Sequence, residues 1–299
     1  MRVLTRGDLD GLTSSLLLTI AHEVSEIRFA HPKDVQDGKV KVDAEDIIVN
    51  LPYVKGCGMW FDHHVSEEGK LPGIGEFAGR FAVAPSAARV VYDHYPQHKK
   101  AFDRFTDLLE ATDRLDGAQL TKQEVEAPTG WILLGLTLDP RTGLGPEFQK
   151  YFRWLVEYIK EVPLAKILEH KEVSKRTERV LREQEEFKGA LAKAAKADGG
   201  VVITDFRGQK GVPVGNRFLV FTLFPDCHVE ARIFNGHAGQ TVIAAGASIF
   251  NRTCRVNIGQ LLGSYGGGGH KGAGTAQLAP EKAEKQLAEI LATLKANRE

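Results

Sequence analysis

The sequence predicts an α/β protein with a parallel-sheet N-terminal domain, a long linking helix and a smaller mixed α/β C-terminal domain. Three observations predict this class. Short apolar runs alternate with helical patterns over the first hundred residues, a charged segment with few helix breakers begins at Pro163, and strand-like runs between turns begin near Gly199. Alternation of short apolar runs with helices is typical of a parallel sheet that is covered on both faces.

The predicted N-terminal sheet is built from short apolar runs, and residues 13–24 between the first two runs have a helical apolar face. Each run is short enough for a buried strand. The four runs are Val3–Thr5, Ile27–Ala30, Ile47–Val49 and Met59–Phe61.

Helical patterns follow these strands. Pro85 and Ser86 are helix start signals, and Pro96 ends that helix after Tyr95. Two further stretches carry apolar residues at three- and four-residue spacing, which indicates amphipathic helices. They contain Phe102, Phe105, Leu109 and Thr112, and then Phe148, Tyr151, Phe152, Leu155 and Ile159.

The segment 163–197 is predicted to be a solvated helix that links two domains. Glu172 and Arg176 have the four-residue spacing of a stabilising ion pair, and no sustained apolar heptad indicates a coiled coil. After it, a glycine-rich stretch and an amphipathic helix from about Pro280 follow the last predicted strand. The predicted C-terminal strands are Val201–Ile203, Phe218–Leu223, Val229–Phe234 and Val242–Phe250. We expect a first domain at 1–160, a linker at 161–198 and a second domain at 199–299.

The composition narrows the class of protein. The 299 residues are 42% hydrophobic, enough for two cores, and 39 Lys+Arg balance 39 Asp+Glu. This neutral net charge argues against long duplex DNA as a partner. A processive single-strand nuclease is also disfavoured, because the sequence has no basic stripe interleaved with aromatic residues. Three cysteines without a C-x-x-C motif indicate neither a disulfide framework nor a thiolate zinc site. No apolar run has the ~20 residues of a membrane span, so we expect a cytoplasmic protein without a membrane partner. The sequence is compatible with a homodimer but does not determine the oligomeric state.

Polar residues follow three of the predicted N-terminal strands. Asp8 and Asp10 follow the first, Asn50 the third, and the triplet Asp62–His64 the fourth. Because the carboxyl ends of parallel strands meet at one edge of a sheet, we expect these side chains to converge. Carboxylate and imidazole ligands without a thiolate suit Mn²⁺ or Mg²⁺.

Each of these features also has a structural explanation. An Asp-x-Asp-Gly turn is often only a helix cap, and two adjacent histidines can be a satisfied core pair. Asp113 is predicted near the apolar face of a helix, where a carboxylate needs a metal or an ion pair with Arg114 or another neighbour.

Taken together, the motifs resemble the DHH phosphoesterase family, and the resemblance covers nearly the whole chain. The ordered set is more specific than any single member. It comprises Asp8–Gly11, Ile47–Pro52, Asp62–His64, Ala111–Arg114, and Gly266–His270 with Ala273–Gly274.

The resemblance implies a metal-binding N-terminal lobe and a C-terminal lobe that binds substrate. One metal would be held by Asp10, His63 and Asp113, and a neighbouring metal by Asp8. Asn50 occupies the position of an aspartate that bridges both metals in the family. A water bound to the metals would attack phosphorus.

The same resemblance assigns the substrate contacts. His64 would face the substrate phosphate, and Asp62 would orient a histidine. In the C-terminal lobe, Gly267, Gly268, Gly269 and His270 would bind phosphate through backbone N–H groups and the imidazole. Arg252 resembles a substrate-binding arginine, with a surface salt bridge as the alternative. The G-x-G-x-x-G match at 267–272 is not a dinucleotide site, because about 27 residues remain after it, too few for the rest of that motif.

Two positions depart from the family pattern. Arg6 stands where the family has a metal-binding histidine, and Asn50 replaces an aspartate. Arginine only donates hydrogen bonds and cannot bind a cation. Three carboxylates (Asp8, Asp10 and Asp113), one guanidinium and one divalent ion sum to zero charge. We therefore hypothesise that Arg6 pairs with Asp8 in place of a second metal.

The sequence thus predicts a divalent-metal phosphoesterase with one Mn²⁺ (or Mg²⁺) per site, in which Arg6 and His64 assist the reaction. Its expected substrate is a short single-stranded oligonucleotide, the product of a cyclic dinucleotide, or polyphosphate. The alternative is a catalytically impaired protein that binds a phosphoryl ligand or nucleotide.

Overall fold

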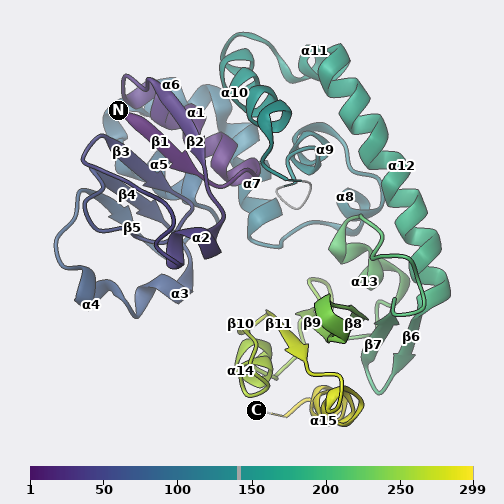
Figure 1. Ribbon diagram of the computed structural model, residues 1–299. Coiled ribbons are helices and arrows are strands. Elements are labelled where there is room, and N and C mark those ends of the chain that lie inside the picture. Colours follow the sequence, from purple (N-terminus) through teal and green to yellow (C-terminus); the bar gives the residue numbers. More distant parts are fainter. Residues whose placement is uncertain (140–142, 299) are drawn as a thin grey trace. The chain divides into compact units, whose positions relative to one another are not determined.

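The computed structural model describes residues 1–139 and 143–298, and this chain divides into two compact units (Figure 1). The first unit comprises Met1–Leu120 and Pro128–Glu178, and the second comprises Thr121–Ala127 and Arg179–Glu299. The chain therefore passes from one unit to the other three times. The third passage lies within the long helix α12 (Lys171–Ala194).

The first unit contains a five-stranded parallel sheet with the order β2-β1-β3-β4-β5. Its strands are β1 (Arg2–Thr5), β2 (Glu26–Phe29), β3 (Asp46–Val49), β4 (Met59–Asp62) and β5 (Gly79–Phe81). Thr5 pairs with both Phe29 and Val49, so the carboxyl ends of the central strands reach the same edge.

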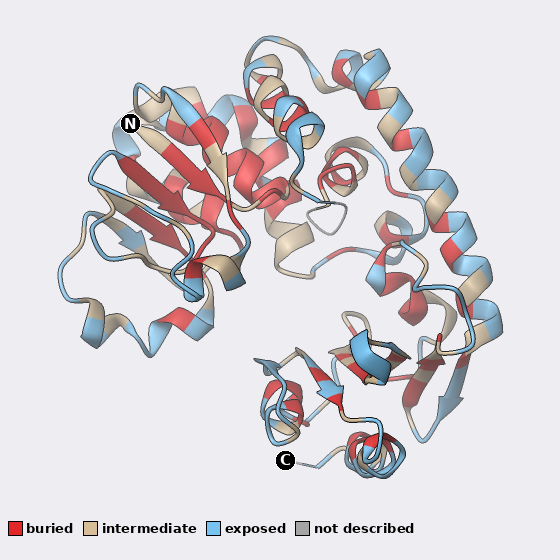
Figure 2. Cartoon of the chain, viewed as in Figure 1, coloured by how far each residue is buried: buried red, intermediate tan, exposed pale blue. Residues whose placement is uncertain are grey.

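The central strands β1, β3 and β4 are buried on both faces, as continuous apolar strands require (Figure 2). One face packs Val3, Ile47 and Phe61 into a core with Leu12 and Leu16 of α1 (Leu9–Ala21). The opposite face packs around Trp60. The other helices of this unit are α2 (Pro32–Gln36), α3 (Val65–Glu68), α4 (Leu71–Ile74), α5 (Ala87–His94), α6 (Lys99–Phe102), α7 (Thr106–Asp116), α9 (Gly130–Leu136), α10 (Pro146–Glu161) and α11 (Leu164–Glu169), with 3-10 turns η1 (Pro96–His98) and η2 (Asp103–Phe105).

The second unit contains a mixed six-stranded sheet with the order β10-β11-β9-β8-β7-β6. Only β7 and β8 pair in parallel within it. Its strands are β6 (Ala195–Asp198), β7 (Val201–Asp205), β8 (Val229–Asn235), β9 (Thr241–Ala247), β10 (Gly268–His270) and β11 (Ala273–Leu278). Its helices, besides the end of α12, are α8 (Lys122–Glu126), α13 (Val220–Leu223), α14 (Ile258–Gly263) and α15 (Ala283–Ala296), with 3-10 turns η4 (Arg217–Leu219) and η5 (His237–Gly239).

The α/β class is confirmed, and two element predictions are wrong. Residues 218–223 form the end of η4 and α13 rather than a strand. Asn216 begins this helical segment by accepting a hydrogen bond from the Phe218 N–H, and a short apolar run alone does not distinguish helix from strand. The segment 163–197 is not one helix, because α11 ends before His170 and β6 begins at Ala195. Among the described residues, no helix combines the length and apolarity needed to cross a bilayer.

Candidate metal centre and active site

The carboxyl edge of the first sheet carries the polar residues that the sequence singled out. Asp8 and Asp10 follow β1, Asn50 follows β3, and Asp62 ends β4. These strands are adjacent and parallel in the order β1, β3, β4, so the predicted convergence at this edge is the arrangement that the structure shows.

Asp10 is a fully enclosed carboxylate on the first turn of α1, with 1% of its surface exposed. Its two oxygens accept hydrogen bonds from the N–H groups of Ala87 and Ala88, at 2.9 and 2.8 Å. These are the first two residues of α5, whose N–H groups have no partner within the helix. The start of α5 therefore fixes the orientation of the Asp10 carboxylate.

His63 directs its Nε2 at two carboxylates. Its Nδ1 lies 3.0 Å from the carbonyl oxygen of Ala84, which only accepts, so Nδ1 carries a proton. Its Nε2 is buried and makes no hydrogen bond with any described residue. Nε2 nevertheless lies 3.1 Å from Asp116 Oδ2 and 3.6 Å from Asp10 Oδ2. Two carboxylates facing this nitrogen favour a positive charge there, either a proton on Nε2 or a metal ion between the three groups. Asp10, His63 and Asp116 thus form a group able to hold a metal ion.

The third member of this group is Asp116, not Asp113. Asp113 Oδ1 accepts a hydrogen bond from Ser86 Oγ at 2.6 Å, and Oδ2 accepts two from Arg89, at 2.9 Å from Nε and 2.5 Å from Nη2. An ion pair with a neighbour, the structural explanation considered for Asp113, is what the structure contains. Asp116 follows one turn later on α7 and reaches His63.

The charges of the group are strongly interdependent. Burial, reinforced by the Asp116 carboxylate, raises the pKa of Asp10 to about 7. Burial disfavours the protonated form of His63, but Asp116 and Asp10 outweigh it and raise the pKa of His63 to about 10. Burial also disfavours ionised Asp116, but the facing His63 lowers the pKa of Asp116 overall. The centre therefore attracts a positive charge.

Arg6, Asp8 and Asn50 form a second cluster beside the first. Arg6 Nε lies 3.1 Å from Asp8 Oδ2, and Asn50 Nδ2 donates to Asp8 Oδ1 at 3.0 Å. The Gly11 N–H also donates to Oδ1, at 2.9 Å, so Asp8 caps α1. Arg6 therefore meets Asp8 as an ion pair, without a hydrogen bond from Nε, and Asn50 meets it as a hydrogen-bond donor. Burial raises the pKa of Asp8, while Arg6 opposes this rise.

Asp62 and His64 form a pair directed at the same edge. Asp62 is fully buried and lies 2.7 Å from His64 Nδ1, which must therefore donate the hydrogen bond. The side chain of His64 is 39% exposed. Burial opposes protonation of His64, but the Asp62 carboxylate prevails and raises the pKa of His64. The arrangement supplies an oriented, partly exposed imidazole whose protonated form is favoured by Asp62.

The predicted substrate residues of the C-terminal lobe lie in the second unit. Gly268, Gly269 and His270 form the exposed strand β10, which pairs with β11, and Gly267 precedes it. A Cβ at Gly269 would lie 2.1 Å from the Ala273 oxygen, so this strand requires glycine there. Arg252 donates from Nε to the Ile249 carbonyl at 3.0 Å. The substrate roles of these residues stay predictions.

Sequence reasoning did not single out Asp116 or Arg89, which the structure places beside the predicted site residues. Asp116 follows Asp113 by three residues, a spacing that places both on one helix face, and this signal was available. Arg89 follows Ser86 by three residues, but its partner comes from α7 and is set by tertiary structure alone.

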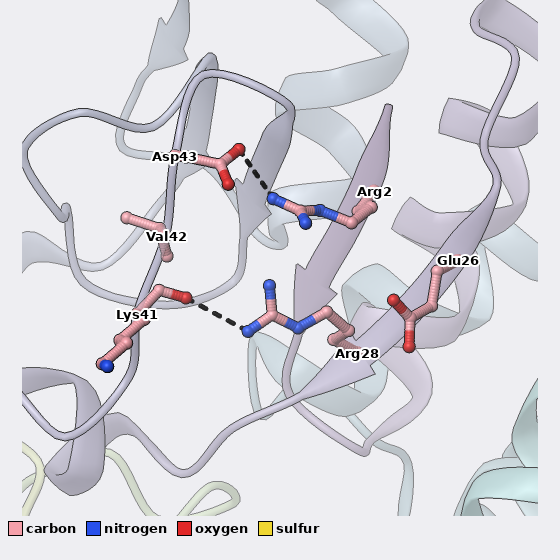
Figure 3. A pocket seen from close by; sticks show the side chains of 6 residues that line it. All are labelled: Arg2, Glu26, Arg28, Lys41, Val42 and Asp43. Atoms are coloured by element: carbon pink, nitrogen blue, oxygen red, sulfur yellow. Dashed lines mark hydrogen bonds and ion pairs between the residues drawn. The ribbon is translucent and has the colours of Figure 1, made fainter.

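A separate cavity lies at the other end of the strands. It has a volume of about 280 Å³ and is lined by Arg2, Glu26, Arg28, Lys41, Val42 and Asp43 (Figure 3). The buried carboxylate of Asp46 accepts hydrogen bonds from Arg2 Nε at 2.9 Å and from Arg28 Nη1 at 3.1 Å. These arginines therefore join β1 and β2 to the amino end of β3.

Comparison with known proteins decides the family. No family model and no curated protein sequence matches this chain. A solved structure of a pGpG-specific phosphodiesterase, PggH from Vibrio cholerae, is 36% identical, covers 99% of both chains and superposes with a TM-score of 0.85. This chain belongs to the DHH phosphoesterase family.

Two more distant structures share the DHH fold. The DHH domain of a protein described as a member of a family of ribosomal proteins is 12% identical, with a TM-score of 0.66, and the match covers 100% of this chain and 87% of that one. RecJ from Thermus thermophilus, solved with Mn²⁺, is 12% identical, with a TM-score of 0.53, and the match covers 99% and 52%. As a DHH phosphoesterase, the chain is a phosphoric ester hydrolase, which favours the enzyme over the impaired binding protein.

Proposed function

We propose that this DHH phosphoesterase hydrolyses a short linear dinucleotide with one divalent ion held by Asp10, His63 and Asp116. The observation that carries the proposal is the buried Nε2 of His63, which lacks a hydrogen-bond partner among the described residues and faces two carboxylates. A bound divalent ion would acidify water and polarise a phosphoryl oxygen. Nitrogen and oxygen ligands without a thiolate favour Mn²⁺ or Mg²⁺.

The charges support one ion rather than two. Asp8, Asp10 and Asp116 contribute three negative charges, and Arg6 contributes one positive charge. Asp113 and Arg89 neutralise each other, and Asp62 favours a compensating positive charge on His64, because it raises the pKa of that imidazole. The remaining two negative charges match one divalent cation. The Arg6 guanidinium and the Asn50 amide group both contact Asp8, the carboxylate that the resemblance assigns to a second ion.

The chain's own residues supply the other roles. His64, oriented by Asp62, is suited to donate a hydrogen bond to the substrate phosphate and a proton to the leaving oxygen. Arg6, whose side chain is 36% exposed, is suited to stabilise charge on the phosphoryl group. Arg252, the glycines 267–269 and His270 are proposed to bind the rest of the substrate.

The choice of substrate rests on the relative of known specificity. Short oligonucleotides, cyclic-dinucleotide products and polyphosphate all have the required phosphoryl chemistry. The relative from Vibrio cholerae is described as specific for pGpG, a linear dinucleotide, and is similar over the whole chain. We therefore propose pGpG or a close analogue as the substrate.

The test combines a metal count with a substrate panel. Purified protein saturated with Mn²⁺ and desalted is analysed for metal, and hydrolysis is measured on pGpG, a single-stranded pentanucleotide, duplex DNA and polyphosphate. We expect about one Mn²⁺ per chain, and cleavage of pGpG in preference to the others. Asp116→Asn should lose the ion, whereas Asp107→Asn, an exposed carboxylate on the same helix, should retain it. Retention of Mn²⁺ by Asp116→Asn, or no hydrolysis of any substrate, would overturn the proposal.

A further inference from the structure

Arg89 lies where the start of α5 contacts α7, next to the segments that carry or contact the proposed metal ligands. Its guanidinium, 27% exposed, makes two hydrogen bonds to Asp113 Oδ2. Its backbone N–H donates to Ser86 Oγ at 3.0 Å, and that hydroxyl donates in turn to Asp113 Oδ1 at 2.6 Å. Both carboxylate oxygens of Asp113 thus accept hydrogen bonds from the start of α5. Because Asp113 lies on α7, these bonds join α5 to α7.

The segment joined in this way contacts two of the three ligands. The carbonyl of Ala84 accepts the Nδ1 proton of His63, which directs Nε2 toward Asp10 and Asp116. The N–H groups of Ala87 and Ala88 hold the two oxygens of Asp10. A displacement of residues 84–88 would therefore move His63 and Asp10 together.

The third ligand is tied to the same junction through α7. Asp113 and Asp116 are separated by three residues and lie on one face of that helix. Fixing Asp113 against Ser86 and Arg89 therefore also fixes the helical turn from which Asp116 reaches His63. The ion pair between Arg89 and Asp113 connects all three ligand-bearing segments.

We propose that Arg89 and Asp113 are positioning residues of the metal centre, acting through residues 84–88 and α7 without touching the ion. The inference rests on the proposed function, because it assumes a cation at Asp10, His63 and Asp116. It opposes a specific alternative, in which Asp113 is itself a ligand and Arg89 competes with the ion for its carboxylate. The two mechanisms predict opposite changes in metal affinity when Arg89 is replaced. Loss of Arg89 weakens metal binding in ours and strengthens it in the alternative.

The experiment measures Mn²⁺ affinity by electron paramagnetic resonance on the full chain, without substrate. We expect Arg89→Met to weaken Mn²⁺ binding about tenfold, in the range for groups that orient metal ligands. Added guanidinium ion should restore part of this affinity. Arg80→Met is the matched control, because Arg80 is exposed and donates to the Asp93 carbonyl near the far end of α5. It should leave Mn²⁺ affinity unchanged.

The outcomes separate this inference from the proposed function. A wild-type protein that binds no Mn²⁺ overturns both. A wild-type protein that binds Mn²⁺, with equal or tighter binding by Arg89→Met, overturns the inference alone. Thermal melting of the metal-free variants checks that the fold is retained. If Arg89→Met does not fold, Arg89→Lys carries the same test, because lysine keeps the charge but cannot make the two-pronged contact.

Discussion

Arg6 Nε lies 3.1 Å from Asp8 Oδ2, at the position where the family pattern places a histidine ligand of a second metal. The guanidinium supplies one positive charge to the partly buried carboxylate of Asp8, whose side chain is 19% exposed. Asn50 adds a neutral donor to the other oxygen of Asp8. The two departures are therefore complementary, because both side chains contact the same carboxylate, Arg6 as an ion pair and Asn50 as a hydrogen-bond donor.

Restoring the family pattern should restore the second ion. We expect the double variant Arg6→His, Asn50→Asp to raise bound Mn²⁺ from about one to about two ions per chain, because it removes the competing cation and adds an imidazole and a carboxylate. The measurement is elemental analysis after saturation and desalting. Arg80→His is the control for an added surface histidine. An unchanged metal count would refute the view that Arg6 takes the place of an ion.

His64 should affect the reaction without affecting the ion. We expect His64→Gln to lower kcat by about 10²- to 10⁴-fold, the range for a lost general acid. Mn²⁺ affinity should stay within about twofold of the wild type. Asp62→Asn should have a smaller effect of the same kind, because His64 remains but loses the carboxylate that raises its pKa. Steady-state kinetics and Mn²⁺ titration test both, and a loss of Mn²⁺ binding in His64→Gln would make His64 a ligand instead.

The stability of the first unit should depend on pH through His22. Its Nε2 lies 2.6 Å from the hydroxyl of Tyr95, and burial, then His98, the N-terminal amine and His94, lower the pKa of His22. Unfolded histidine titrates near 6.5, so below that value the unfolded chain binds more protons. Stability is therefore present above about pH 6.5 and is lost as the pH falls through the lowered pKa.

Urea unfolding followed by circular dichroism at pH 7.5, 6.5 and 5.5 checks this pH dependence. His22→Gln should lose less stability than the wild type over this range, because glutamine can still bond Tyr95 but does not titrate. His237→Gln, an exposed histidine of the second unit, should behave like the wild type. Equal losses in the wild type and His22→Gln would contradict the prediction.

The sequence predicts which residues lie at the carboxyl edge of the sheet, because this prediction does not require the order of the strands. Short apolar runs locate β1 to β4, and any parallel sheet brings their carboxyl ends, with Asp10 and His63, to one edge. Periodicity could not classify residues 218–223, where six apolar or small residues fit a strand or a short helix equally. Nor did it find the three-residue strands β5 and β10.

The choice between Asp113 and Asp116 shows where sequence reasoning ends. Both carboxylates lie on the same face of α7, so helical geometry alone does not tell which one reaches His63. The answer depends on Arg89, because a cation on α5 engages one of the two and leaves the other facing Nε2. That contact spans 24 residues of sequence, and charge pairing of this kind is decided by tertiary packing.

The glycine-rich strand β10 packs against α14, and we expect only one of two alanine substitutions on α14 to displace it. A Cβ at Gly259 would lie 2.5 Å from the Gly269 carbonyl carbon and 2.6 Å from the His270 nitrogen, both backbone atoms that cannot rotate away. Gly263 lies on the same helix, and a Cβ added there would meet nothing within 4 Å. Gly259→Ala should therefore displace β10 and destabilise the unit by about 1–3 kcal/mol. Gly263→Ala should be neutral or stabilising by up to about 1 kcal/mol.

The same two variants test the role predicted for residues 267–270. If β10 binds substrate phosphate, Gly259→Ala should raise the KM for pGpG well above that of Gly263→Ala, while Mn²⁺ affinity, which depends on residues of the first unit, stays unchanged. Thermal melting and steady-state kinetics on both variants give the comparison. The two variants could instead have the same KM while Gly259→Ala shows the expected loss of stability. That result would contradict a role of the glycine strand in substrate binding, because displacing β10 would then change stability without changing the KM.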